Sequence, residues 1–482
     1  MSVATLLLPA IRWDDARGFD GERETIERGL ALGVGGFILL GGEQDAVRQL
    51  TKELRQRTRV PLLIAADLER GAGQQFAGAT GLPPLAAIAS LNDPEAVRRA
   101  ARLTAREART LGVNWDYAPV CDVDLAPDNP VLGTRAFGGD PHRVASLAAT
   151  WVKACQAEGV LACAKHFPGH GRTHTDSHLV LPVVDASRQA LLETDLLPFR
   201  AVIEAGVASI MTAHVAYPAL DPSGTPATMS REILQWLLRQ QMKFDGLIAS
   251  DALVMEGALE GRTDAEAAIA AINAGCDLLL YPRDAGALAG ALEEALARHE
   301  LSEEMVQQAL RRRLKWAQWA SPPNEYRRPS ATDVAWGAQL ADRVVRMVRG
   351  ARPALESPFD VVVVDDDVEG PLPPVSRDPF VAALDQLGCR PRRVGAPDPA
   401  ADRAVVIALF GEARAWKGRA GYGEAARDAV ASACAAAPHA LVMQFGHPRL
   451  IRELTGAAAI ATAWGGEAAM QQAAARWLAR GG

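Results

Sequence analysis

The stretch Leu161-Ala-Cys-Ala-Lys-His166, continued by Phe-Pro-Gly-His-Gly-Arg-Thr-His-Thr-Asp-Ser-His178, joins a short apolar run to a segment rich in titratable side chains. Four of the nine histidines of the chain lie between His166 and His178. Proline costs a helix about 3 kcal/mol and glycine about 1 kcal/mol. Pro168 and the two glycines that flank His170 therefore predict a loop. Folding alone does not require so many charged groups, so we expect a buried strand that ends in a functional loop.

Similar apolar runs recur as far as Tyr281 and alternate with helical patterns. They lack a clean two-residue alternation, which suits strands that are buried on both faces of a parallel sheet. Eight such units predict an α/β fold, a (β/α)8 barrel, whose usual size is about 250 residues. The predicted strands are Thr5–Ile11, Gly36–Leu40, Pro61–Asp67, Val113–Val120, Leu161–His166, Ser209–His214, Leu247–Asp251 and Cys276–Tyr281. The predicted helices include Pro94–Leu111, His142–Glu158, Arg188–Ala205 and Thr263–Ala274.

Polar side chains fall at or just past the C-terminal ends of these predicted strands. In (β/α)8 barrels that rim carries the chemistry, whereas the opposite rim carries stability. One acidic strand end can equally be a helix N-cap, and that alternative stays open for Asp116 and Asp277. Capping alone does not explain charged or imidazole groups at so many ends. These residues are Asp67, Glu69, Asp116, Lys165, His166, His214 and Asp251.

The chain is too long for one ordinary core, so its length predicts two or three domains. Residues 1–320 form the predicted barrel, which the helix Glu303–Trp319 closes. Residues 321–356 hold a Pro-rich linker, Ser321–Ser330, and a bridging helix, Val334–Arg349. Residues 357–482 form a smaller C-terminal α/β domain without a nucleotide-binding glycine motif. Its predicted strands are Phe359–Asp365, Ala404–Phe410, Ala440–Phe445 and Ala457–Ala463, and its helices are Pro379–Leu387, Glu424–Ala436 and Glu467–Arg480.

The composition is that of a soluble globular protein. A formal charge of −7 without a dense Lys/Arg run argues against a nucleic-acid partner. The six cysteines lack C-x-x-C spacing, so buried reduced thiols are expected. No signal peptide and no membrane-spanning run is evident, and we expect a cytoplasmic protein. The oligomeric state is not indicated.

The histidines of the opening stretch allow two kinds of chemistry. A spacing of four would place His166, His170, His174 and His178 on one helix face as metal ligands. Because a loop is expected here, we predict no metal or other cofactor, and a metal-dependent barrel hydrolase remains the alternative. Acid–base chemistry suits the loop better. Asp176 beside His178 can fix the imidazole tautomer and stabilise its charge, and Asp251 can act as a nucleophile or electrostatic stabiliser.

The segment Lys165–His178 with Leu181-Pro182 resembles the signature of glycoside hydrolase family 3, in its bacterial β-N-acetylglucosaminidase (β-N-acetylhexosaminidase) branch. The resemblance covers the whole predicted barrel. Further marks stand in the family order: Asp67-Leu-Glu69, Asn129–Gly138, Met211-Thr-Ala-His-Val215, Pro226-Ala-Thr-Met-Ser230 and Ser250–Gly257. The C-terminal part looks like the second α/β domain of the family, with weaker marks.

The resemblance implies a retaining exo-β-N-acetylglucosaminidase that acts on muropeptides or small chitooligosaccharides. Asp251 would be the nucleophile, and His178, assisted by Asp176, would be the acid/base. Lys165 would lie beside the nucleophile and favour its ionised form. The expected substrate-binding residues are Asp67, Arg135, Lys165, His166, His214 and Met255.

The motif Asp67-Leu-Glu-Arg-Gly-Ala-Gly-Gln-Gln75 departs from the family pattern. Arg70 replaces a glycine, and Gln75 stands where the family has a sugar-contacting arginine. Three alternatives therefore remain: another family 3 glycosidase such as a β-glucosidase, a phosphorylase that uses the same intermediate, and a catalytically inactive sugar-binding protein.

Overall fold

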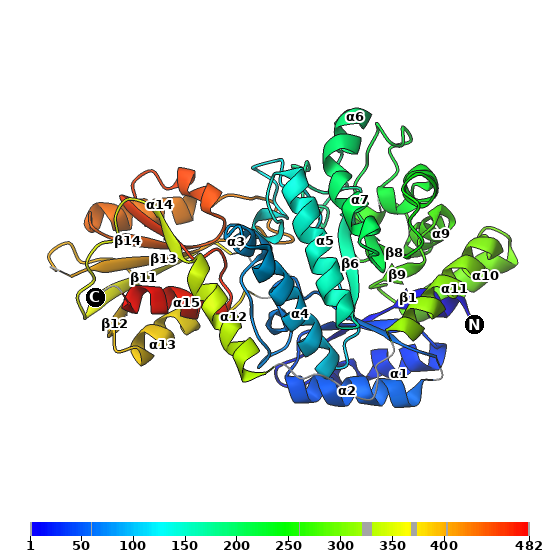
Figure 1. Ribbon diagram of the computed structural model, residues 1–482, viewed down its shortest axis with the longest axis horizontal. Coiled ribbons are helices and arrows are strands. Elements are labelled where there is room, and N and C mark those ends of the chain that lie inside the picture. The colour runs from blue at the N-terminus through cyan, green and yellow to red at the C-terminus, as the bar shows by residue number, and fades with distance from the viewer. Residues whose placement is uncertain are drawn as a thin grey trace. The chain divides into compact units, whose positions relative to one another are not determined.

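The computed structural model describes residues 2–58, 60–259, 261–320, 330–367, 374–401 and 403–480 (Figure 1). The chain forms two compact units. The first consists of Met1–Thr80, Pro94–Leu125 and Phe137–Ser330. The second consists of Gly81–Asp93, Ala126–Ala136 and Ala331–Gly482. The predicted linker at 321–329 lies outside the described residues.

The first unit is a parallel barrel, as predicted. Its strands are β1 (Leu7–Leu8), β2 (Ala10–Arg12), β3 (Gly36–Leu40), β4 (Leu63–Ala66), β5 (Trp115–Asp116), β6 (Leu161–Phe167), β7 (Ser209–Thr212), β8 (Leu247–Ala252) and β9 (Leu278–Leu280). They pair in the order β1-β9-β8-β7-β6-β5-β4-β3-β2, and every pair is parallel.

The first predicted strand, Thr5–Ile11, is divided in the structure. Thr5 lies in a 3-10 turn, and Pro9 separates β1 from β2. Proline has no N–H to donate to a strand ladder, but its carbonyl accepts a hydrogen bond from Ile38 N. β1 therefore pairs with β9 while β2 pairs with β3. This division brings the two ends of the sheet together at Pro9 and nearly closes the barrel.

The helices of this unit are α1 (Arg23–Leu32), α2 (Gln44–Arg57), α4 (Pro94–Thr110), α5 (Pro141–Ala157), α6 (Arg188–Ala190), α7 (Leu197–Glu204), α8 (Glu256–Leu259), α9 (Asp264–Ala274), α10 (Ala285–Ala297) and α11 (Glu303–Trp319). π-helical segments cover Leu191–Asp195 and Glu232–Gln241. The predicted helix Arg188–Ala205 is thus α6, a π turn and α7. Local sequence explains several helix starts: Asp140 caps α5, and Thr263 and Glu266 form a capping box on α9.

Apolar side chains fill the barrel interior. Trp115 and Tyr117 belong to a buried cluster with residues of the other strands, and Trp115 Nε1 donates to Ser209 Oγ at 2.7 Å. Ala317 and Ala320, from α11 and its end, belong to the same cluster. Ala320 O also accepts a hydrogen bond from Asn114, which precedes β5. α11 therefore covers the N-terminal end of the barrel and leaves the carboxyl end for chemistry.

The second unit is a doubly wound α/β sheet. Its strands are β10 (Arg346–Arg349), β11 (Phe359–Asp365), β12 (Pro391–Val394), β13 (Val405–Phe410), β14 (Leu441–Phe445) and β15 (Ala459–Thr462), in the order β10-β15-β14-β13-β11-β12. All pairs are parallel except β10 with β15. The order from β12 to β15 is the 2-1-3-4-5 arrangement of flavodoxin-like folds.

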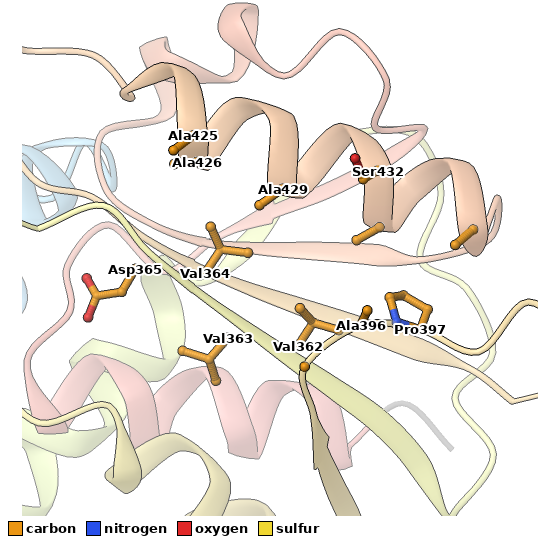
Figure 2. A pocket seen from close by; sticks show the side chains of 13 residues that line it. Val362, Val363, Val364, Asp365, Ala396, Pro397, Ala425, Ala426, Ala429 and Ser432 are labelled. Carbon is orange, nitrogen blue, oxygen red and sulfur yellow. The ribbon is translucent and has the colours of Figure 1, made fainter.

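Helices cover both faces of this sheet. α12 (Ala331–Val344), α13 (Asp378–Gln386) and α15 (Ala468–Ala479) share one core, and α14 (Glu424–Ala436) packs on the opposite face. α3 (Leu85–Ala89) contributes Ala86 and Ala87 to the first core. Beside α14 lies a hollow of about 440 Å³. Figure 2 shows Val364 of β11 pointing toward α14 and Val363 pointing away.

Two expectations about this unit were incomplete. The predicted helix Val334–Arg349 ends at Val344, and Arg346–Arg349 forms β10 instead. β12, Pro391–Val394, was not predicted at all. Both are edge strands with exposed arginines, so neither has the apolar run that marks a buried strand. The four predicted central strands are confirmed.

Candidate active site

Most of the predicted site residues lie at the carboxyl ends of the barrel strands. Asp67 follows β4, and Lys165 and His166 lie in the last three residues of β6. His214 follows β7 by two residues, and Asp251 lies at the end of β8. Because these strands are parallel neighbours, their ends form one rim. The structure thus brings together side chains that are far apart in the sequence.

Asp251 is a carboxylate surrounded by imidazoles. Burial by itself would raise the pKa of Asp251. The nearby charges of His166, His214 and His178 and a hydrogen bond from Ala252 N, at 2.8 Å, outweigh burial and lower this pKa below its usual value. Asp251 is therefore ionised at neutral pH and interacts with three histidines from three different segments.

His178 and Asp176 form a dyad in the loop that follows β6. His178 Nδ1 donates to Asp176 Oδ1 at 2.8 Å, and the backbone N of His178 donates to the same oxygen at 2.9 Å. The Asp176 side chain is buried, whereas the His178 side chain is 19% exposed. The carboxylate therefore holds the Nδ1–H tautomer of a ring that is partly accessible.

Lys165 forms ion pairs with two carboxylates. Its Nζ lies 2.6 Å from Asp67 Oδ1 and 2.7 Å from Glu69 Oε1. Lys165 and Glu69 are buried, and Asp67 is partly exposed. The sequence placed Lys165 beside Asp251 as the group that keeps the nucleophile ionised. Three imidazoles and one backbone N–H lower the pKa of Asp251, and the ammonium of Lys165 pairs with Asp67 and Glu69. The effect of Lys165 on Asp251 stays a prediction.

A buried carboxylate, Asp122, holds the backbone at the end of β6 and the start of the loop that follows it. Its Oδ2 accepts from His166 Nδ1 at 2.7 Å. Its Oδ1 accepts from the backbone N of His166 at 3.1 Å and of His170 at 2.6 Å. Burial raises the pKa of Asp122, but His166, His170 and these hydrogen bonds together bring it below the usual value. The His166 ring is thereby fixed with Nδ1 toward the protein.

His214 and Met255 both contact the end of β8, the strand that carries Asp251. His214 is fully buried, its Nδ1 lies 2.8 Å from Thr228 Oγ1, and its Nε2 lies 3.2 Å from Ala252 O. Burial lowers the pKa of His214. Met255 is buried, and its backbone N donates to Ala252 O at 3.1 Å. Both residues therefore contact the segment that carries Asp251.

Two residues of interest are arranged differently from the rim residues. Arg135 belongs to the second compact unit, where its guanidinium donates to Val131 O. Its role in sugar binding stays a prediction. Gln75, which stands in place of the family arginine, lies in the barrel unit, and its Oε1 accepts from Gly41 N at 3.0 Å. The amide thus contacts the backbone that follows β3.

The rings of the four spaced histidines have different hydrogen-bond partners, although the rings of His166 and His170 lie in edge contact. His166 contacts Asp122, His170 contacts Thr173 and Ser177, His178 contacts Asp176, and His174 is exposed. In the part of the chain that the structure describes, no group of three or more His, Cys, Asp or Glu side chains is arranged to hold a metal ion. Over the same ranges, no helix has both the length and the apolar character needed to cross a membrane.

The open question about Asp116 and Asp277 is answered by their contacts. Asp116 Oδ1 accepts from Leu68 N at 3.3 Å, in the loop after β4. Asp277 precedes β9, on the opposite rim, and forms ion pairs with Arg239 and Arg312. Neither residue caps a helix. Only Asp116 lies on the rim that carries the site.

Sequence reasoning missed several residues that shape the site. Asp122 lies two residues after the predicted strand Val113–Val120, which contains Asp116. This second acidic residue was the sequence signal that could have pointed to Asp122. Thr228 and Glu69 lie inside motifs that the sequence had marked, but no role was assigned to them. Ser177 separates the two dyad residues and carried no signal of its own.

Comparisons with known proteins agree with this arrangement. The model of the glycosyl hydrolase family 3 N-terminal domain matches residues 20–315. The β-N-acetylglucosaminidase/β-glucosidase of Cellulomonas fimi is 36% identical over 298 residues, which span 59% of this chain and about half (52%) of that protein. The β-hexosaminidase of Thiobacillus denitrificans is 40% identical over 257 residues, 51% of this chain and 71% of that one.

Among solved structures, the family 3 β-N-acetylglucosaminidase of Paenibacillus sp. is 26% identical with a TM-score of 0.84, and the match covers 99% of this chain and 96% of that one. The matched family model covers strands β3 to β9 and the loop that carries Asp176 and His178. On this evidence the chain belongs to glycosyl hydrolase family 3, in its β-N-acetylhexosaminidase branch.

Proposed function

We propose that this chain is a retaining exo-β-N-acetylglucosaminidase, with Asp251 as nucleophile and a His178–Asp176 dyad as acid/base. The observation that carries the proposal is the coupling of Asp251 to His178 across the rim: the imidazole is among the charges that lower the pKa of Asp251. This effect supports a site in which a nucleophile and a proton donor act together, and relatives named β-hexosaminidase share the family.

In the first step, an ionised Asp251 attacks the anomeric carbon, and the bond from this carbon to the leaving oxygen breaks. A carboxylate whose pKa lies below its usual value is unprotonated at neutral pH and ready for this attack. His178 gives its Nε2 proton to the leaving oxygen, so the aglycone departs as a neutral alcohol.

In the second step, the neutral imidazole of His178 takes a proton from water, and the resulting hydroxide oxygen attacks the anomeric carbon. Asp251 leaves as a carboxylate, and two inversions give net retention. Retaining enzymes commonly use two carboxyl groups for these tasks. Here an imidazole replaces the acid, and Asp176 stabilises the charge that this ring carries before the first step and after the second.

The proposed sugar-binding groups can form hydrogen bonds with neighbouring hydroxyls of the sugar ring. Asp67 is partly exposed while its partner Lys165 is buried, so its carboxylate can accept from hydroxyls without losing its orientation. His166 offers Nε2, because Nδ1 is held by Asp122. His214 and Met255 complete the proposed set. The substrate class is a small carbohydrate with terminal β-linked N-acetylglucosamine, from muropeptides or chitooligosaccharides.

The first test compares nitrophenyl β-N-acetylglucosaminide with the β-glucoside for wild type, Asp251→Ala and His178→Ala. We expect release from the N-acetyl substrate, loss with Asp251→Ala, and residual activity with His178→Ala because nitrophenol needs little protonation. The configuration of the first-formed sugar, followed by NMR, should be β. Inverted product, or full activity of folded Asp251→Ala, would overturn the mechanism. Formation of sugar 1-phosphate on adding phosphate would identify a phosphorylase instead.

A further inference from the structure

We propose that His170 and Ser177 are a positioning pair that holds the dyad loop so that His178 meets the leaving oxygen. This inference rests on the proposed acid/base role of His178 and adds two residues to it. Neither residue carries out proton transfer in the proposed mechanism. Their part is to fix the segment from which both dyad residues project.

The pair links two ends of the loop. His170 is buried, and its Nε2 lies 3.0 Å from Ser177 Oγ. Ser177 is also buried and stands directly between Asp176 and His178. A hydrogen bond to this one side chain therefore restrains the backbone of both members of the dyad.

The proton arrangement of His170 follows from its contacts. The hydroxyl of Thr173 donates to His170 O at 3.0 Å, so its oxygen accepts from His170 Nδ1 at 2.7 Å. With the proton on Nδ1, Nε2 of a neutral ring is an acceptor for the Ser177 hydroxyl. Burial lowers the pKa of His170 to about 4, which keeps the ring neutral at neutral pH. The direction of each hydrogen bond is thus determined.

The pair is itself anchored on both sides. The backbone N of His170 donates to Asp122 Oδ1, the carboxylate group that also holds His166. On the other side, Ser177 O accepts from Gly257 N, six residues after the nucleophile, at 3.2 Å. The contacts therefore form one chain from a proposed sugar-binding histidine, through the dyad loop, to the nucleophile segment.

Misplacing a general acid has a specific kinetic signature. A poor leaving group depends on protonation in the transition state, whereas a nitrophenolate leaves with little help. Loss of the Ser177 hydroxyl should therefore slow reactions in proportion to the basicity of the leaving group. A merely structural defect would lower the amount of active enzyme and affect all substrates equally.

The experiment measures kcat/KM on aryl β-N-acetylglucosaminides whose phenols span a range of acidity, for wild type, His178→Ala and Ser177→Ala. Thr175→Ala, an exposed hydroxyl of the same loop, is the matched control. For Ser177→Ala we expect roughly a tenfold loss on the poorest leaving group, little loss on the best, and no change for the control. A uniform loss across the series, or no loss, would overturn the positioning role.

Two substitutions at His170 provide a second readout that does not depend on one variant folding. His170→Gln has a side chain long enough to keep a hydrogen-bond acceptor near Ser177. The shorter side chain of His170→Asn can keep the hydrogen bond to Thr173 but not the one to Ser177. The expected result is a steeper leaving-group dependence for His170→Asn than for His170→Gln, and equal dependence would count against the pair. If His178→Ala itself shows no leaving-group dependence, the proposed acid role fails. If His178→Ala shows it and Ser177→Ala does not, only the positioning inference fails.

Discussion

One oxygen of Asp176, Oδ1, accepts two hydrogen bonds from His178. The ring Nδ1 of His178 lies 2.8 Å from this oxygen, and the backbone N of His178 lies 2.9 Å from it. The aspartate thus sets both the tautomer of the ring and the turn of the backbone that carries it. This double contact separates the dyad from a simple surface ion pair, because the Asp176 side chain is buried.

Asp176→Asn should therefore impair proton transfer more than binding. An amide at this position can offer N–H where the ring needs an acceptor, which favours the wrong tautomer. We expect kcat/KM on a poor leaving group to fall by about 10²-fold or more, with a smaller loss on nitrophenyl substrates. The control is Asp185→Asn, an exposed aspartate a few residues further along. Equal losses on both substrate classes would contradict the assignment.

A substitution at Gly257 tests whether the segment after Asp251 must pack closely against the loop that carries Asp176 and His178. A Cβ at this position would lie 2.6 Å from Ser177 O and 3.1 Å from Val180 O, both backbone atoms. Gly257→Ala should displace the loop and lower kcat/KM most for poor leaving groups. Gly290→Ala, in α10, is the matched control because a Cβ there meets nothing within 4 Å. Unchanged kinetics for Gly257→Ala would mean that the loop moves freely against this segment.

The sequence predicted the barrel because each buried strand is an apolar run that ends in a polar residue. It predicted the dyad because Asp176 and His178 are two residues apart. The ion pairs of Lys165 with Asp67 and Glu69 were not predicted, since they depend on how separate strands place their ends, which no local pattern records. Asp122 was missed for the same reason: its partners lie on the next strand and the loop after it.

In the second unit, prediction failed at the edges of the sheet. β10 and β12 pair on one side only and carry arginines, so their composition resembles a loop or helix. The segments 81–93 and 126–136 were assigned to the barrel, and the structure groups them with the second unit. Ala86 and Ala87 pack in the core of that unit, and alanines in a short helix give no sequence signal for a long-range contact.

A substitution at Asp277 tests whether the N-terminal rim of the barrel contributes to stability and not to substrate binding. It is buried, and it pairs with Arg239 at 2.6 Å and Arg312 at 3.0 Å and accepts from Ile248 N at 2.8 Å. Asp277→Asn leaves a buried guanidinium without its charge partner, which typically costs about 3–5 kcal/mol. We expect a much lower midpoint of thermal unfolding, and an unchanged KM for the folded enzyme. Asp245→Asn, an exposed partner of the same Arg312, should change stability by less than about 1 kcal/mol.

The buried carboxyl group of Asp116 should make the free energy of unfolding depend on pH. It is fully buried, its Oδ1 accepts from Leu68 N, and its Oδ2 has no hydrogen-bond partner among the described residues. Burial, opposed by Lys165 and reinforced by Asp67 and Glu69, raises its pKa to about 8. The unfolded chain has the ordinary aspartate pKa of about 3.9. Between these values the folded protein holds a proton that the unfolded chain has lost.

The contribution of Asp116 to the free energy of unfolding is therefore largest below about pH 4 and falls as the pH rises toward 8, by up to about 1.4 kcal/mol per pH unit. Asp116→Asn keeps the acceptor for Leu68 N but does not titrate. Its stability relative to wild type should consequently increase from pH 5 to pH 8, measured by urea unfolding at each pH. Other titrating groups are common to both proteins and cancel in the difference. A difference that stays constant over this range would show that Asp116 is already ionised in the folded protein.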